Sequence, residues 1–474
     1  MSAQSAQEVS LGKKLPSEVL ARIFALAKVH CIHEKCSCGC GRTPIHDHPH
    51  KFDTFVGVCA HWYKVAINTP NLWNHIDIGP KIPARWTRLL LKRTKETPVQ
   101  LHVYVGEKTP TATSSLSRQK PKPEYKVSGA LLMLACHIYR VRSLELAVHA
   151  RSDEELVTSI VQLWFNFGSP NPHNSVVTYW PDISHGEALK LASPEIYNDR
   201  LGNVEKMMLS IGDLRCVGMI PGWGPKTFYN LVNLQLLRIT MHVSLFTSML
   251  FASQDQLETL ELGQILILRE PNWRGCDPIS MSRLRLLNLL SLQDEDSVRL
   301  VLPLIGLPSI LGERRVSLRV QEKTQDILAQ FFARSYMTFL YCHTDSQFIP
   351  SRPLMISLPS VDLLVLSNFN LWKEPAVDKD ANSLPIPVNR LPYVALWDCI
   401  IRDLSIENFI TQRQIKNLHV LYRSGNCPPE AIHVYQAFRA DWMRVFPGLK
   451  CDISMIGPGK LPFFSSMVMT PLPL

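Results

Sequence analysis

Short leucine-rich segments that recur along most of the chain constrain its fold more than any other feature of the sequence. Each holds closely spaced aliphatic residues of the kind that fill a buried strand, and successive segments begin roughly 22 to 33 residues apart. A repeat of this length predicts one supersecondary unit per copy, because no single copy can bury its own apolar face. The segments are residues 142–146, 174–178, 204–209, 234–239, 257–262, 284–289, 316–318, 338–341, 361–366, 394–396 and 418–421.

Helical patterns lie between the leucine-rich segments. Alternation of strand and helix with short connections predicts an α/β fold in which parallel strands stack into a curved solenoid. The acidic run from Asp294 to Asp296 stands where one of these helices begins, so helix capping explains it better than catalysis. The helical patterns cover residues 153–165, 244–252, 294–302, 322–332 and 404–410.

The repeat interval is similar to that of leucine-rich-repeat proteins, although the asparagine ladder of a regular repeat is missing from most copies. The resemblance implies an irregular, degenerate leucine-rich-repeat-like α/β solenoid over residues 131–450. Residues 429–445 carry a final amphipathic pattern, which predicts a helix that caps the open edge of the last repeat. Residues 451–474 contain four prolines and are expected to form a loosely held tail.

Two fragments near the N-terminus carry strong helical patterns. The first begins at Leu15, and Pro16 suits a first helical turn because its missing N–H is not needed there. The second begins at Val58 and ends near Pro70, which disfavours a helical conformation in the residue before it. About 60 residues cannot bury this much apolar surface internally, so either a docked partner or the following domain must cover the excess.

The order of residues in these fragments resembles the F-box, a small three-helix module that docks onto a Skp-type adaptor of a cullin ubiquitin ligase. The closing Leu72-Trp73 pair and the Ile-rich segment after it resemble the fungal (basidiomycete) F-box proteins in particular. The resemblance covers residues 14–80. It implies that the adaptor-binding residues are Leu15, Pro16, Val19, Leu20, Ile23, Phe24, Val58, Cys59, Trp62, Leu72 and Trp73.

A Cys/His-rich insertion at residues 31–53 separates the two fragments, where F-box sequences have a much shorter polar link. A structural zinc clip is one interpretation, because thiolates and imidazoles are the usual zinc ligands. The Cys-x-Cys-x-Cys and His-x-His-x-His spacings do not match paired two-residue gaps, which favours a surface loop, and we assign no cofactor. The zinc candidates are Cys31, Cys36, Cys38, Cys40, His46, His48 and His50.

Residues 81–130 link the two parts of the chain with a predicted helix from Pro83, a strand over residues 99–105 and a basic loop. Residues 85–142 hold twelve Lys and Arg against three acidic residues, which accounts for the formal net charge of +9. Such a stretch could meet an acidic partner. Nucleic-acid binding is not expected, because the loop lacks the interleaved aromatic residues on which bases stack.

Neither a targeting segment nor a membrane segment is evident. Residues 1–13 are small and polar, and we expect them to be disordered. Apolar runs fall well short of the roughly 18 residues that a membrane helix needs. Of the 12 cysteines, four lie in the insertion and seven of the others are scattered singly, which is typical of reduced thiols. We therefore expect a cytoplasmic or nuclear protein without a membrane partner.

The motifs of common catalytic sites are missing from the sequence. It contains no Walker loop, no Gly-x-Ser-x-Gly elbow and no His-Glu-x-x-His, so we expect a protein that is not an enzyme. The F-box resemblance implies a substrate-recognition adaptor of a Skp–cullin–F-box ubiquitin ligase, with the solenoid binding an unknown protein substrate. The alternative hypothesis is a zinc- or nucleic-acid-binding scaffold that acts outside a ligase.

Overall fold

The chain is a mixed α/β protein whose main strands pair in parallel, as the alternation of strand and helix predicts. Its contacts divide it into two compact units, with the division after Thr227. The computed structural model describes residues 15–32, 57–78, 84–105, 133–148, 154–171, 174–179, 189–191, 201–221, 223, 225–292, 294–309, 312–346, 348–371, 390–401, 403–423 and 429–456.

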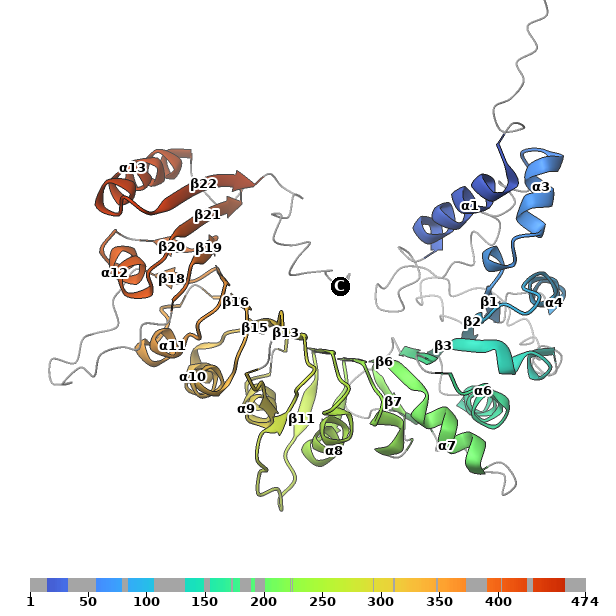
Figure 1. The fold of residues 1–474 in the computed structure, drawn as a ribbon. Coiled ribbons are helices and arrows are strands. Elements are labelled where there is room, and N and C mark those ends of the chain that lie inside the picture. Colours follow the sequence, from blue (N-terminus) through green and yellow to red (C-terminus); the bar gives the residue numbers. More distant parts are fainter. Residues whose placement is uncertain are drawn as a thin grey trace, which may run out of the picture. The chain divides into compact units, whose positions relative to one another are not determined.

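In the first unit, parallel strands pair in the order β1-β2-β3-β4-β6, and β5 pairs separately with β7. Helix α1 lies beside α3, before the first strand (Figure 1). The elements are α1 (Ser17–Ile32), α3 (Ala60–Ile67), the 3-10 turn η3 (Pro70–Leu72), β1 (His75–Ile78), α4 (Ala84–Arg93), β2 (Val99–Val105), η4 (Ile138–Arg140), β3 (Val141–Val148), α6 (Glu154–Phe167), β4 (Asn174–Tyr179), β5 (Leu189–Leu191), α7 (Leu201–Leu209), β6 (Ile211–Val217) and β7 (Met219–Pro221).

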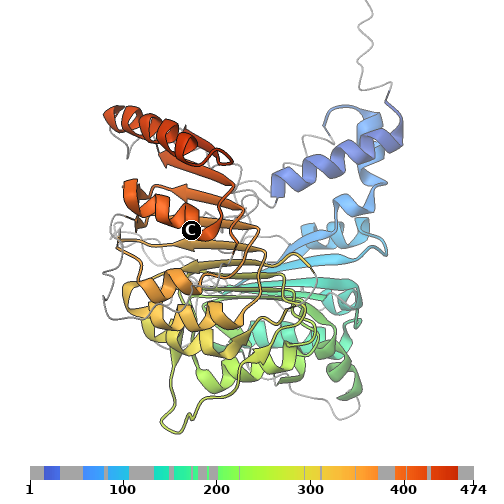
Figure 2. The same cartoon turned by 60° about the vertical axis from the view of Figure 1, so that its left-hand side comes forward.

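In the second unit, parallel strands pair in the order β8-β10-β13-β15-β16-β17-β19-β21-β22, and helices line one face of them (Figures 1 and 2). The main strands are β8 (Asn233–Leu237), β10 (Thr259–Gly263), β13 (Leu286–Ser291), β15 (Arg315–Arg319), β16 (Phe339–His343), β17 (Leu363–Ser367), β19 (Tyr393–Trp397), β21 (Asn417–Arg423) and β22 (Lys450–Ile456). The helices are α8 (Val243–Ser253), α9 (Glu295–Leu304), the 3-10 turn η8 (Glu322–Thr324), α10 (Gln325–Arg334), α11 (Arg352–Ser357), α12 (Asp403–Arg413) and α13 (Pro429–Val445).

Short secondary strands pair with one another beside the main strands of the second unit. Residues Leu266–Leu268 (β11) pair with Thr240–His242 (β9), and Ile400–Ile401 (β20) pair with Asn370–Leu371 (β18). A further pair joins Ile279–Ser280 (β12) to Ile305–Gly306 (β14). Each strand of such a pair comes from a different repeat, so these pairs hold neighbouring repeats together.

One predicted strand is wrong. Residues 204–209 belong to helix α7, and the strand of this repeat is β6, which begins at Ile211. The buried residues Val204 and Met207 are three positions apart, which is helical spacing. The run of apolar residues at 207–209 hides this period, because a short continuous run is compatible with either structure.

The predicted tail also needs correction. Strand β22 occupies residues 450–456 and pairs in parallel with β21, so Cys451 lies opposite Leu418. The predicted helix at residues 429–445 is present as α13, but it connects two paired strands instead of ending the repeats. Residues 457–474 lie outside the described part of the chain.

One side of every main strand in the second unit forms a continuous apolar row. The parallel register aligns Leu340, Leu364, Val394 and Leu418, and all four are fully buried. Because side chains alternate between the two faces of a strand, these aligned residues share one face of the paired strands. Burial of the row explains why leucine and valine recur in the sequence.

A left-handed residue follows several of the main strands. Arg238, Gln264, Asn368 and Asp398 have φ between 51° and 65°, a region that residues other than glycine seldom adopt. The backbone N–H of each donates a hydrogen bond to a carbonyl at or near the end of the next strand, with N···O distances of 2.8–2.9 Å. The same turn therefore recurs from repeat to repeat without a conserved residue type.

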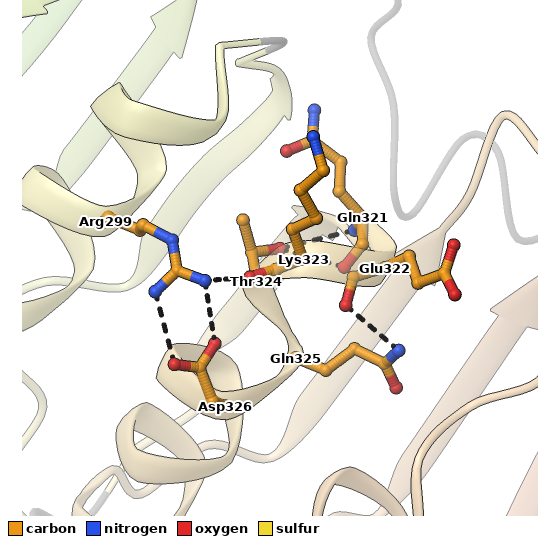
Figure 3. A network of polar contacts seen from close by, with 7 residues as sticks. All are labelled: Arg299, Gln321, Glu322, Lys323, Thr324, Gln325 and Asp326. Carbon is orange, nitrogen blue, oxygen red and sulfur yellow. Dashed lines mark hydrogen bonds and ion pairs between the residues drawn. The ribbon is translucent and has the colours of Figure 1, made fainter.

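Neighbouring helices are joined by polar contacts on the outside of the second unit. Arg299 of α9 contacts both carboxylate oxygens of Asp326 at 3.2 Å, and it also donates to the carbonyl of Lys323 (Figure 3). The cap predicted at the start of α9 is confirmed, because Asp294 accepts a hydrogen bond from the backbone N–H of Ser297 at 2.7 Å. No helix among the described residues is long and apolar enough to cross a membrane.

Candidate functional site

Helix α1 packs against α3 through one apolar side. Leu20 and Phe24 are fully buried, and the ring of Phe24 meets that of Trp62 edge to face with centroids 5.2 Å apart. The imidazole of His61 contacts the carbonyl of Leu15 at 3.1 Å and ties the beginning of α1 to α3. The two fragments that resemble an F-box therefore contact each other in space.

The end of the second fragment is anchored inside the first unit. Leu72 and Trp73 are buried, and the indole N–H of Trp73 donates to the carbonyl of Ala66 at 2.8 Å. The guanidinium of Arg93 lies over the Trp73 ring at 4.3 Å from its centroid. The end of the second fragment forms the short 3-10 turn η3 over Pro70–Leu72, and the chain then enters β1.

A neighbouring face of α1 exposes an apolar stripe. Val19, Ile23 and Leu26 are 42%, 40% and 59% exposed, and their spacing places them on one face of the helix. Two further large apolar side chains, Val58 and Tyr63, are exposed in the second fragment. A row of apolar residues facing solvent on one helix is a feature of docking surfaces.

The eleven predicted adaptor-binding residues fall into three classes. The buried class packs the helices together and consists of Leu20, Phe24, Leu72 and Trp73. The half-buried class consists of Leu15, Cys59 and Trp62. The exposed class consists of Pro16, Val19, Ile23 and Val58. Leu26 and Tyr63 were missed by the sequence reasoning, although helical spacing from Val19 and Ile23 could have identified Leu26.

The predicted zinc candidates are largely beyond what the structure describes. Cys31 lies in the last turn of α1, and the other six candidates from Cys36 to His50 fall outside the described residues. The basic loop that follows β2 lies outside them as well.

A group of metal-competent side chains lies elsewhere in the first unit. Strand register aligns Asp77 of β1 with His102 of β2 and Glu145 of β3, and His75 lies two residues before Asp77 on the same face. Asp77 Oδ1 is 3.1 Å from His75 Nε2 and 3.3 Å from His102 Nδ1. Glu145 Oε1 is 3.6 Å from His102 Nε2. We call these four residues the strand-face cluster.

The strand-face cluster is built around a buried imidazole. The side chain of His102 is 1% exposed, whereas Asp77 and Glu145 are partly exposed. Burial works to raise the pKa of the Asp77 carboxyl, but hydrogen bonds from His102 and His75 outweigh this effect and hold the pKa well below its usual value. Asp77 is therefore ionised at neutral pH.

The sequence reasoning missed the strand-face cluster. Its signal is present in the alternation of His75, Asp77 and the apolar residues Ile76 and Ile78, which marks a strand with one polar face. Only the register between strands brings His102 beside this pair, and register cannot be derived from the residues of one strand.

A cluster of buried apolar residues lies on one face of the second unit's strands. Its members are all strand residues, and they alternate along the strands with the aligned row of Leu340, Leu364, Val394 and Leu418. Tyr393 extends the same face and is 50% exposed. The cluster, which we call the strand aromatic cluster, consists of Phe339, Tyr341, Val365, Ala395, Trp397 and Leu421.

The buried cysteine thiols are unreactive. Burial raises the pKa of Cys216 to about 12 and that of Cys399 to about 12. A thiol with so high a pKa is almost wholly protonated at neutral pH and is a weak nucleophile. Among the cysteines whose side chains the structure describes, none forms a disulfide.

No family model matches the chain, and no curated protein matches it either.

Proposed function

We propose that the chain is a substrate-recognition adaptor of a Skp–cullin–F-box ubiquitin ligase. Residues 14–80 act as the F-box that docks a Skp-type adaptor, which in turn binds the cullin scaffold. The repeats form an irregular leucine-rich-repeat-like solenoid that binds a protein substrate. The protein acts without catalysis of its own, by raising the effective concentration of substrate lysines near the conjugating enzyme.

The exposed apolar stripe on α1 is the observation that carries the docking proposal. The same helix buries Leu20 and Phe24 against α3 while Val19, Ile23 and Leu26 face solvent. Residues that only stabilise the module would be buried, as Leu20 and Phe24 are. An apolar row left outside is best explained by a partner that covers it, and its i, i+4, i+7 spacing is that of helix-docking anchors.

The arrangement of the second unit supports the solenoid part of the proposal. Parallel strands, left-handed turns and helices recur in one order, and each repeat pairs with the next through its strands. Repeats of this kind commonly bind partners on the strand face. Tyr393, which is 50% exposed and shares a strand face with the buried strand aromatic cluster, is the candidate for substrate contact.

A binding assay with a purified Skp-type adaptor tests the proposal. We expect Ile23→Asp combined with Val58→Asp to abolish detectable binding, because a lost apolar anchor costs about 2 kcal/mol or more, roughly a 30-fold loss in affinity for each. Both residues are exposed, so the variant should fold. Phe251→Asp is the matched control, since Phe251 is an exposed apolar residue of α8 in the second unit. If the wild type, the Ile23→Asp/Val58→Asp variant and Phe251→Asp bound the Skp-type adaptor equally well, the docking proposal would be overturned.

A further inference from the structure

We propose that His75, Asp77 and His102 form a binding site for a divalent transition-metal ion of the zinc class. Neither the F-box resemblance nor the ligase proposal assigns a role to these residues. They are the one group of three or more metal-competent side chains found close together in the described part of the chain, with all three ligand atoms within 4.8 Å of one another. Imidazole nitrogens with a carboxylate oxygen are a donor set that suits Zn²⁺.

The donor spacing fits a single ion. Zn²⁺ bonds of about 2.0–2.2 Å in a tetrahedron hold the ligand atoms roughly 3.3–3.5 Å apart. Asp77 Oδ1 lies 3.1 Å from His75 Nε2 and 3.3 Å from His102 Nδ1, so two of the three separations are already close to these values. The third separation, between the two imidazoles, is no more than 4.8 Å, and the pairing of β1 with β2 holds both rings beside Asp77.

Glu145 completes the arrangement from behind His102. Its Oε1 is 3.6 Å from His102 Nε2, on the side of the ring away from Asp77. Histidine ligands of metals usually donate their other ring N–H to a carboxylate, which fixes the tautomer and the orientation of the ring. With the ion bound, a proton on His102 Nε2 facing Glu145 would leave the lone pair of Nδ1 for the ion, so Glu145 acts as a positioning residue.

The electrostatics favour a cation at this position. The buried imidazole of His102 lies between two carboxylates, Asp77 and Glu145. A divalent ion bound between the imidazoles and Asp77 would neutralise this negative charge where water is largely excluded. Three protein ligands leave a fourth position for water or another group. His75 and Asp77 lie on β1, and His102 lies on β2. The ion would therefore link β1, the strand that follows the N-terminal helices, to β2.

Zinc titration of the full-length protein, stripped of metal with a chelator, tests the site. We expect one Zn²⁺ to bind the wild-type protein at the strand-face cluster, and His75→Gln and Asp77→Asn each to weaken this binding at least about 100-fold. Glu145→Gln should weaken it about 10- to 100-fold, as expected for a residue behind a ligand. His419→Gln is the control, since His419 lies 3.9 Å from Asp452 on another strand and should bind zinc as the wild type does.

The cysteines and histidines of residues 31–53 could bind zinc independently, so the wild-type protein is also loaded with Co²⁺. A near-ultraviolet and visible spectrum without a thiolate-to-cobalt charge-transfer band supports the strand-face cluster, because its ligands are nitrogen and oxygen. A strong charge-transfer band together with unchanged zinc affinity in His75→Gln and Asp77→Asn would overturn the proposal. Failure of the wild-type protein to bind Zn²⁺ would overturn it too. The Co²⁺ spectrum is recorded on the wild-type protein, so it does not depend on whether a variant folds.

Discussion

Single buried arginines connect the repeats of the second unit. The guanidinium of Arg314 is almost fully buried and donates to the carbonyls of Ser282, Leu284, Pro308 and Tyr336 at 2.7–3.3 Å. These acceptors come from more than one repeat, so one side chain satisfies backbone groups that the strands leave unpaired. Burial lowers the pKa of Arg314, but an arginine remains charged even so.

We predict that Arg314→Lys destabilises the second unit by about 2–4 kcal/mol, because a lysine cannot reach four carbonyls and leaves buried acceptors unsatisfied. Denaturant unfolding of the two proteins measures the difference. Arg285→Lys is the matched control, since Arg285 is 75% exposed and lies 3.9 Å from Glu258. That change should alter stability by less than about 0.5 kcal/mol. Equal effects of the two substitutions would contradict the structural role of Arg314.

The left-handed turns offer a second test at the residue scale. Gln264 follows β10 with φ of 51°, and its backbone N–H donates to the carbonyl of Ser291 at 2.8 Å. A β-branched side chain is strained in this conformation, so Gln264→Val should destabilise the protein by about 1–2 kcal/mol. Glycine adopts the conformation without strain, and Gln264→Gly should leave the melting temperature near or above that of the wild type. If Gln264→Gly were less stable than Gln264→Val, the turn would not be strained.

At the scale of elements, the sequence predicts most strands because each carries its apolar residues in a short run. Ten of the eleven predicted segments overlap strands of the structure, and α13 begins and ends at its predicted residues. The failures have a common cause. Residues 204–209 and β22 are too short for their apolar residues to show a period that distinguishes helix, strand and irregular structure. Pairing with a neighbouring element decides which structure they adopt.

The candidate site was predicted less well than the elements. The helical period identified α1 and its apolar residues, but it could not tell Leu20, which packs against α3, from Val19 and Ile23, which face solvent. That distinction depends on the direction from which α3 approaches. The strand-face cluster depends in the same way on the register of β1 and β2.

The contact between α9 and α10 gives a pH-dependent prediction at the element scale. Burial acts to raise the pKa of Asp326, but hydrogen bonds from Arg299 and the backbone, together with the charge of Arg299, lower it overall. The pair is largely exposed, with Arg299 39% and Asp326 58% exposed, so it should contribute only about 0.2–1 kcal/mol. A lowered pKa means that this contribution is present above the unfolded-state pKa and is lost as pH falls through the folded-state pKa.

We therefore expect Asp326→Asn to be less stable than the wild type at neutral pH, and the difference to shrink once the pH falls below about 4. Denaturant unfolding at several pH values measures it. The same substitution made in an Arg299→Met background should have a smaller effect, because the charge partner shown in Figure 3 is gone. A difference that grows in acid would contradict the assigned sign.

At the scale of the whole molecule, the proposed functions fall in different compact units. The apolar stripe of α1 belongs to the first unit, whereas the strand aromatic cluster and Tyr393 belong to the second. Substitutions that remove exposed side chains from one unit should leave the folding and the binding of the other unchanged, because sites without shared partners act additively.

This separation predicts two opposite phenotypes. Ile23→Asp combined with Val58→Asp should lose the Skp-type adaptor while still binding the protein substrate, so the substrate is held but not ubiquitinated. Tyr393→Ala should keep the adaptor and weaken substrate capture by about 1–2 kcal/mol, because an exposed aromatic residue beside an apolar cluster is a typical binding anchor. Quantitative affinity capture of both partners with each variant measures the two effects. If Tyr393→Ala released the adaptor, or the α1 variant released the substrate, the two surfaces would not act independently and the assignment of one function to each unit would be wrong.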